Sequence, residues 1–150
     1  MDSAAEIIRR LDLEPHPEGG WYRETWRDFR ADDGERGSGT SILFLLEAGQ
    51  RSHWHRIDAV ELWLFQAGAP LQLSTATGPL TEEIRLGPDI LAGDAPQAVV
   101  AAGQWQSARS LGAWSLAACV VVPAFDFAGF ELAPPGWDPR GAPGSVLGLD

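Results

Sequence analysis

Histidine and glutamate side chains gather in the segment 49–68, which contains two of the three histidines of the chain. Alternate residues of a β-strand point to the same face, so His53 and His55 are predicted to share one face. Glu61 lies near the start of the next apolar segment. If these faces line one cavity, the combination of imidazole and carboxyl groups suits metal binding, proton transfer or hydrogen bonding to a polar ligand.

Two aromatic residues follow Glu61 at strand spacing. Trp63 and Phe65 have the same parity as Glu61, so all three are predicted to share one strand face. An aromatic wall at that place would suit the apolar face of a sugar ring. For Phe65, packing in the core is an equally valid interpretation.

A second polar cluster occupies residues 18–24. Tyr22 and Glu24 are predicted to share one strand face, and Arg23 the other. Tyr22 is a candidate proton donor that Glu18 or Glu24 could orient. The guanidinium fork of Arg23 or Arg56 is a candidate for binding an anionic ligand group. The alternative is an edge strand in which an arginine pairs with a nearby carboxylate. His16, between two prolines, is expected to be structural.

The rest of the pattern predicts an all-β protein with a short N-terminal helix. Ser3 and Glu6 form a capping-box signature, and apolar residues at helical spacing predict a helix over 4–12. The apolar segments that follow are short and bounded by glycine, proline or aspartate, as in β-sandwiches and barrels. Strands are predicted near residues 21–27, 40–47, 52–57, 61–67, 70–76, 81–86, 97–101, 105–109, 113–122 and 126–132. Such a series favours a double-sheet jelly roll.

The length predicts one domain over residues 1–150, because a chain of this size builds a single core. The helix belongs to segment 1–14, the barrel to 15–132 and an irregular tail to 133–150, which is rich in proline and glycine. The polar segment 28–39 is predicted to be a loop, either a lid or a plain connection.

Charge and composition restrict the partners of the chain. A net charge of -10 and a pI near 4.6 disfavour nucleic acids and anionic membranes, which leaves small molecules or proteins. All 11 basic residues are arginine, so Schiff-base catalysis by lysine is excluded. Cys119 lies in an apolar run and is expected to be a buried thiol. The chain shows no secretory signal and no apolar run near the ~20 residues of a membrane span, so a cytoplasmic protein is expected.

The spacing around His55 resembles the first motif of the cupin superfamily. The matching positions are Gly49, His55, Glu61 and Gly68, with Ile57 in place of the second histidine. The second cupin motif is similar to segment 101–106, in which Gln106 replaces a histidine. Two of the four positions that usually bind metal therefore lack an imidazole.

Late transition metals bind tightly where several imidazoles or thiolates converge, so no firmly held metal is expected. A divalent metal, if the protein uses one, would be held by the remaining donors: His53, His55, Glu61 and Gln106.

Several longer segments occur in the same order as in the small cupin family called cupin 5, or DUF985, which this chain therefore resembles. They are residues 15–26, 40–46, 53–56, 61–63, 103–106 and 123–127, so the resemblance covers about residues 10–132. It implies a homodimer of cupin jelly-roll barrels, also called double-stranded β-helices.

The chain also resembles the deoxysugar epimerases of the cupin superfamily. This resemblance implies a metal-independent epimerase or isomerase that acts on a keto-deoxysugar or a nucleotide sugar. His55 would remove a proton next to a carbonyl, Glu61 would orient His55, and Tyr22 would return a proton. The predicted ligand contacts are His53, Trp63, Phe65, Gln106, Arg23 and Glu24. Two alternatives remain: a non-catalytic binding protein for a small polar or sugar-like ligand, and a metal-dependent oxygenase or isomerase.

Overall fold

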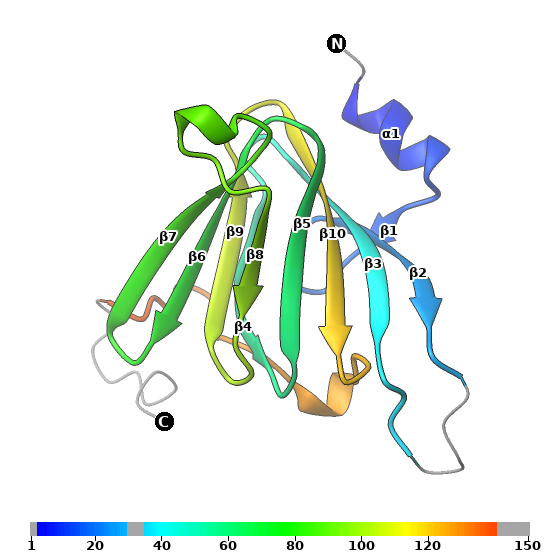
Figure 1. Ribbon diagram of the computed structural model, residues 1–150, viewed down its shortest axis with the longest axis vertical. Helices are drawn as coiled ribbons and strands as arrows, with labels where there is room; N and C mark the ends of the chain where they lie inside the picture. The colour runs from blue at the N-terminus through cyan, green and yellow to red at the C-terminus, as the bar shows by residue number, and fades with distance from the viewer. Residues whose placement is uncertain (1–2, 30–34, 141–150) are drawn as a thin grey trace.

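Two antiparallel sheets form the jelly roll that the sequence predicts, in a computed structural model that describes residues 3–29 and 35–140 (Figure 1). One sheet has six strands in the order β1-β2-β3-β10-β5-β8, and the other has five in the order β11-β4-β9-β6-β7. The elements are α1 (Ala4–Arg10), β1 (Glu14–Pro15), β2 (Trp21–Arg27), β3 (Thr40–Glu47), β4 (Arg51–Ile57), β5 (Val60–Gly68), β6 (Leu71–Thr77), β7 (Leu80–Leu86), η1 (Ile90–Ala92), β8 (Gln97–Val100), β9 (Trp105–Ser110), β10 (Trp114–Val122), η2 (Phe127–Gly129) and β11 (Phe130–Leu132).

The predicted strand bounds agree with the structure to within one residue, except at the last strand. The segment 126–132 begins with the 3-10 helix η2 instead, and only its last three residues form β11. Asp126 is the reason, because its side chain accepts a hydrogen bond from the backbone N–H of Ala128 and closes a turn. The two-residue strand β1 is too short to leave a pattern in the sequence.

The N-terminal helix ends earlier than predicted. The Ser3 hydroxyl accepts the hydrogen bond from the Glu6 N–H, as the capping signature indicates, but the helix stops at Arg10. Asp12 has a φ of 57°, in the left-handed region, so the chain cannot continue as a helix. Apolar side chains of α1 pack with Leu45 and Trp114 of the six-stranded sheet.

The described part of the C-terminal tail packs against the five-stranded sheet. The Trp137 ring lies 4.6 Å from the Trp105 ring and 6.2 Å from the Trp54 ring, so Trp137, together with Ala133, packs on the outer face of the five-stranded sheet. The rest of the predicted tail, 141–150, and residues 30–34 of the predicted loop lie outside the described residues. No described helix has the length and apolar character needed to cross a bilayer.

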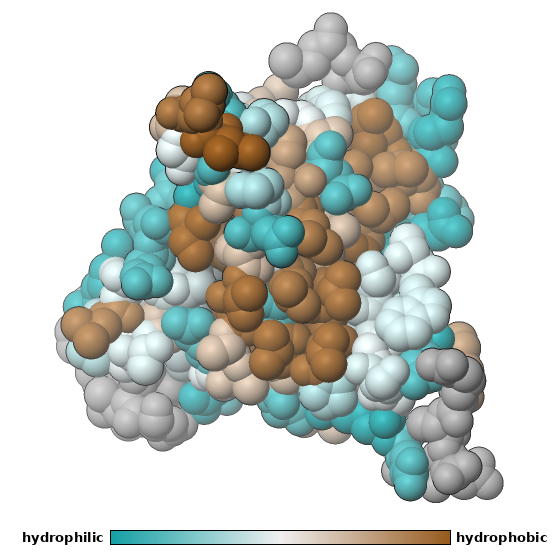
Figure 2. Space-filling model, in the orientation of Figure 1, coloured by the Kyte–Doolittle hydropathy of each residue, from teal (hydrophilic) through white to brown (hydrophobic). Residues whose placement is uncertain are grey.

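The outer face of the six-stranded sheet is apolar over β5, β8 and β10, where Figure 2 shows hydrophobic side chains gathered. Val60, Val99 and Val122 are exposed there by 37%, 61% and 46%. Leu62, Leu64 and Val120 lie between them and are partly exposed. These residues alternate along their strands with buried ones, so the face is a regular surface of the sheet.

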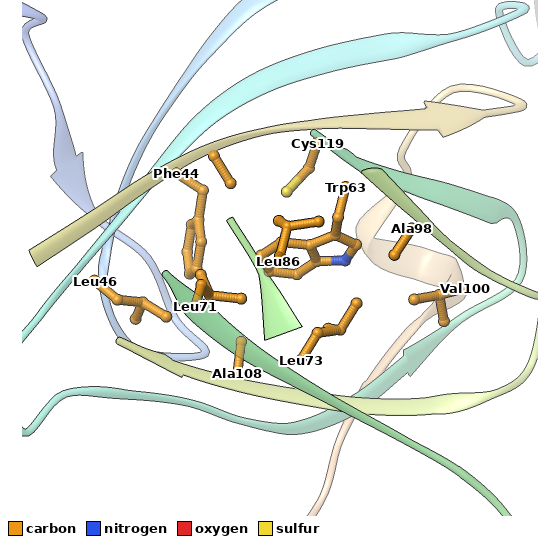
Figure 3. Packing of buried hydrophobic residues seen from close by; sticks show 11 residues of the cluster. Phe44, Leu46, Trp63, Leu71, Leu73, Leu86, Ala98, Val100, Ala108 and Cys119 are labelled. Carbon is orange, nitrogen blue, oxygen red and sulfur yellow. The ribbon is translucent and has the colours of Figure 1, made fainter. Parts of the chain in front are cut away.

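Between the two sheets, a hydrophobic cluster fills one end of the barrel (Figure 3). Its largest members are Phe44 and Trp63, whose rings meet edge to face at 5.8 Å. Leu71, Leu73 and Leu86 pack against them from the five-stranded sheet and are inaccessible to solvent. Because apolar packing occupies this end, polar side chains gather near the other end, beside η2.

Candidate functional site

A cavity of about 70 Å³ lies at the end of the barrel next to η2. The turn after β1 and strand β2 contribute His16, Glu18, Tyr22, Glu24 and Arg27 to its wall. Strands β4 and β5 contribute His55, Ile57 and Glu61, and the segment around η2 contributes Phe125, Phe127 and Phe130. The cavity therefore combines ionisable groups with an aromatic wall.

A β-bulge in β4 separates the two histidines that were predicted to share a face. The register of β4 against β9 shifts between Ser52 and His55, so simple alternation fails there. His55 is buried and faces the cavity, whereas the ring of His53 contacts the carbonyl oxygen of Pro134 at 3.0 Å. His53 does not line the cavity, and the prediction that both imidazoles reach it is wrong.

The tautomer of His55 is set by a backbone carbonyl. Its Nδ1 lies 2.8 Å from the carbonyl oxygen of His53, which can only accept, so Nδ1 carries the proton and Nε2 keeps its lone pair. Burial lowers the pKa of His55, while the charge of Glu61 acts in the opposite direction. The ring is thus a neutral base.

Glu61 is held by a chain of buried hydrogen bonds. The indole N–H of Trp63 donates to Oε1 of Gln106 at 2.8 Å, which orients the amide so that its NH₂ donates to Glu61 at 2.8 Å. The thiol of Cys119 interacts with the same carboxyl group. Burial raises the pKa of Glu61 to about 7, although His55 and Gln106 oppose the shift.

Glu18, which the sequence suggested only as a possible partner of Tyr22, lies at the centre of the site. Its carboxyl group is hydrogen-bonded to the Ser52 hydroxyl, and it lies 3.3 Å from Nδ1 of His55 and 3.3 Å from Nδ1 of His16. Burial raises the pKa of Glu18 to about 8, so the group is mostly protonated at neutral pH. Among these groups, Glu18 is therefore the strongest candidate for a proton donor.

His16 lines the cavity as well, which the expectation of a purely structural role did not include. Its Nδ1 accepts a hydrogen bond from the backbone N–H of Glu18 at 3.1 Å, and its ring packs on Tyr22 at 4.5 Å. Burial and the neighbouring His55 lower the pKa of His16 to about 4, so the ring is neutral at physiological pH. It supports Glu18 without supplying a charge.

A glycine turn inserts Glu18 into the barrel. Gly19 has a φ of 106°, and a Cβ at this position would overlap the carbonyl oxygen of Arg51 in β4. Only glycine allows this close approach of the turn to β4. The consecutive glycines after an acidic residue are the signal in the sequence for such an inserted side chain.

Replacing Gly19 by alanine should lower the free energy of unfolding by about 3 kcal/mol, because left-handed strain and a backbone overlap act together. Gly49→Ala is the matched control, since Gly49 has a φ of 81° and no atom near a new Cβ. The control should lose only about 1 kcal/mol from conformational strain. Urea denaturation of both variants measures the difference, and equal losses would contradict the proposed docking of the turn.

The other predicted site residues are divided among the cavity wall, the core and the protein surface. Tyr22 and Glu24 line the cavity, but the Tyr22 phenol is hydrogen-bonded to Glu14 and its pKa is raised by burial and by Glu14 and Glu24. Arg23 instead donates to the carbonyl oxygen of Leu11 at 3.3 Å and is not part of the wall.

The predicted aromatic wall is formed by different residues. Trp63 is 1% exposed within the hydrophobic cluster, and Phe65 packs against that cluster, so neither lines the cavity. Gln106 is fully buried and reaches the site only through Glu61. The phenylalanines at the cavity are Phe125, Phe127 and Phe130, whose rings meet edge to face at 4.8 to 5.9 Å.

The donor set does not suit a tightly held transition metal. Ile57 offers no donor atom, and the Oε1 of Gln106 already accepts the Trp63 N–H. Across residues 3–29 and 35–140, no group of three or more histidine, cysteine, aspartate or glutamate side chains is placed to hold a metal ion. His55 and Glu61 alone fall short of the three protein ligands of a catalytic zinc site.

Comparisons with known proteins agree with this architecture. A protein from Shewanella oneidensis, with a crystal structure, is 38% identical; the match covers 89% of this chain and 85% of that one, with a TM-score of 0.84. A hypothetical protein from Leishmania major is 30% identical over 88% of each chain, with a TM-score of 0.81. KdgF from Halomonas sp. is 14% identical, with coverage of 80% and 94% and a TM-score of 0.58, which shows a shared fold alone.

A comparison with curated proteins gives no match. The family model described as "Cupin superfamily (DUF985)" matches residues 5–133. The chain therefore belongs to the DUF985 family of the cupin superfamily.

Proposed function

We propose that the protein is a metal-independent epimerase or isomerase that moves a proton next to the carbonyl group of a small sugar-like compound. The observation that carries this proposal is the pairing of a neutral imidazole, His55, with a buried protonated carboxyl group, Glu18, at one cavity. Enzymes that transfer protons in this way often combine, in one site, an acid whose pKa is raised and a base whose pKa is lowered.

In the proposed reaction, Nε2 of His55 takes the proton from the α-carbon of the substrate, and the electron pair of that C–H bond forms the enol double bond. Glu18 gives its proton to the carbonyl oxygen, which becomes the enol hydroxyl. Glu61 stabilises the resulting imidazolium through its charge. To give the isomer, the imidazolium of His55 returns its proton to the neighbouring carbon while Glu18 accepts the proton of the other enediol hydroxyl. To give the epimer, water protonates the α-carbon on the opposite face, Glu18 recovers the enol proton and His55 releases its proton to solvent.

In this proposal the acid is Glu18, which acts at the carbonyl oxygen, and Tyr22 does not return a proton to the carbon. The Tyr22 phenol donates its hydrogen bond to Glu14, and its raised pKa makes it a weaker acid. Glu18 lies 3.3 Å from Nδ1 of His55 and keeps a proton at neutral pH. Tyr22 then acts as part of the cavity wall.

The volume of the cavity restricts which part of a substrate enters it. Ligand pockets commonly measure ~300 to 1,000 Å³, and this cavity measures about 70 Å³. It admits the reacting end of a sugar but not a nucleotide. We therefore propose that the part of the substrate inside the cavity is no larger than a small keto compound.

Deuterium exchange tests this function. The protein, purified and treated with a chelator, is incubated in heavy water with hydroxyacetone, dihydroxyacetone or glyceraldehyde, and NMR follows deuterium incorporation at the α-carbon. The proposal expects saturable incorporation that the chelator does not change. Exchange that appears only after a divalent metal is added would point to the metal-dependent alternative.

The second candidate function is a non-catalytic binding protein. The apolar wall formed by Phe125, Phe127 and Phe130 favours it, because aromatic surface binds ligands without any chemistry. Such a protein would show ligand-dependent thermal stabilisation with no deuterium incorporation.

We also propose that the apolar face over β5, β8 and β10 binds a second copy of the chain. The chain has a net charge of -10, but the strands of this face, β5, β8 and β10, expose no charged side chain here; the exposed residues are apolar apart from glutamine, so two copies can meet without like-charge repulsion. Light scattering should give a dimer for the wild type and a monomer for Val99→Glu. Leu91→Glu, at a fully exposed position in η1, is the control that should remain dimeric.

A monomeric wild-type protein at micromolar concentration would contradict this interface.

A further inference from the structure

A larger groove adjoins the candidate active site. It has a volume of about 520 Å³, and it shares Arg27, Phe125 and Phe127 with the wall of the cavity. Because the same three side chains line both spaces, a molecule whose reacting end occupies the cavity would extend past them into the groove. We call this space the outer groove; Arg27, Arg36, Phe125, Asp126 and Phe127 are among the residues that line it.

Among the described residues that line the outer groove, both guanidinium groups are already paired with carboxylates. Arg27 donates two hydrogen bonds to Glu24, at 2.8 and 2.9 Å. Arg36 donates to Asp58 at 2.8 Å and to the carbonyl oxygen of Ala124 at 2.6 Å. The charge of each of these guanidinium groups is thus balanced by a carboxylate, and Asp28, Glu35 and Asp126 add further negative charge to the described wall. This part of the groove therefore disfavours a phosphate group.

The same groups suit hydroxyl groups. A guanidinium with five N–H donors keeps unused donors after it binds one carboxylate, and the carboxylate of Asp126 supplies acceptors beside it. The Phe127 side chain is 53% exposed at the edge of the groove and can cover the apolar face of a ring. Paired charges next to an exposed aromatic ring match an uncharged, hydroxyl-rich ligand.

We propose that the outer groove is a subsite for the uncharged polyhydroxyl portion of the substrate, so that the protein acts on a free sugar or a glycoside and not on a sugar phosphate or nucleotide sugar. This inference rests on the proposed function, since it assumes that the carbonyl end reacts in the cavity. Phe127 and Arg27 then determine specificity at the junction of the two spaces.

Binding measurements by saturation-transfer NMR test the subsite without requiring turnover. The probes are hydroxyacetone, which fits the cavity alone, the free ketohexoses D-fructose, D-tagatose and L-sorbose, and the phosphate esters of the first two. We expect at least one free ketohexose to bind more tightly than hydroxyacetone, and its phosphate ester to bind at least about 10-fold more weakly than the free sugar. Phosphate esters that bind as tightly as the free sugars would overturn the proposal.

A variant links the binding to the groove. Phe127→Ala should raise the ratio of the ketohexose Kd to the hydroxyacetone Kd by about 3-fold to 10-fold, because the larger ligand loses its aromatic contact. Leu80→Ala removes a side chain that is 77% exposed at the β6–β7 turn and should leave the ratio unchanged. An unchanged ratio in Phe127→Ala would also overturn the proposal. Failure of the proposed function gives a different result, which is the absence of deuterium exchange into hydroxyacetone whatever the ketohexoses do.

Discussion

Replacing His55 by asparagine should lower the rate of deuterium exchange by about 100-fold to 10,000-fold, the usual contribution of a general base. The asparagine NH₂ can keep the hydrogen bond that Nδ1 makes to the His53 carbonyl at 2.8 Å, so the strand retains its local structure. Only the lone pair of Nε2 is lost. The measurement is the initial rate of exchange into a saturating carbonyl substrate, with circular dichroism to confirm the fold.

His53→Asn is the matched control, because His53 contacts Pro134 and lies outside the cavity. It should exchange at close to the wild-type rate. If His53→Asn lost as much activity as His55→Asn, the metal-dependent alternative, which needs both imidazoles, would gain support. Full activity in His55→Asn would remove His55 as the base.

The stability of the protein should fall by about 2 kcal/mol between pH 6 and pH 8 through the ionisation of Glu18 alone. Burial raises the pKa of Glu18 from 4.5 to about 8, so the folded protein binds this proton more tightly than the unfolded chain does. The stabilising contribution is complete below pH 4.5 and is lost as the pH rises through 8. Glu61, with a pKa raised to about 7, adds a loss of the same sign at lower pH.

The histidine beside Glu18 acts in another pH range. The pKa of His16 is lowered from 6.5 to about 4, so its contribution to stability is complete above pH 6.5 and is lost as the pH falls through 4. Glu18→Gln keeps the shape of the side chain and removes the titration. The difference in unfolding free energy between the wild type and Glu18→Gln should therefore change by about 2 kcal/mol between pH 6 and pH 8.

Urea denaturation at each pH measures this difference. Glu131→Gln changes a surface ion pair with Arg56 and should follow the pH dependence of the wild type. Parallel curves for the wild type and Glu18→Gln would show that Glu18 does not titrate in this range.

The sequence was sufficient to predict most of the strands and that the side chains of His55 and Glu61 point into the barrel. Glycine, proline and aspartate interrupt the apolar segments at most strand ends, and His55 and Glu61 lie on the interior face of their strands, as predicted. The alternation of side chains along a strand predicts which face of the sheet a residue lies on, but not how far along the barrel axis it lies. Trp63 has the parity of Glu61, yet it lies deeper, where apolar side chains fill the interior.

Two other features of the site depend on contacts that no local pattern contains. The β-bulge near Ser52 turns His53 away from the cavity, and alternation alone predicts the opposite. Glu18 enters the barrel from a turn, because Gly19 docks against the backbone of Arg51 far along the chain. The alternation of side chains along strands cannot predict the direction of a side chain that lies in a turn.

The protonation of Glu18 tests the central claim most directly. Carbon-13 NMR of protein labelled at the glutamate carboxyl groups gives a titration curve for each group, and the resonance missing in Glu18→Gln identifies Glu18. The account predicts that this resonance titrates near pH 8, well above the ordinary glutamate value of 4.5. Titration of the Glu18 resonance at the ordinary value would show an ionised group at neutral pH and would contradict a neutral acid–base pair in the cavity.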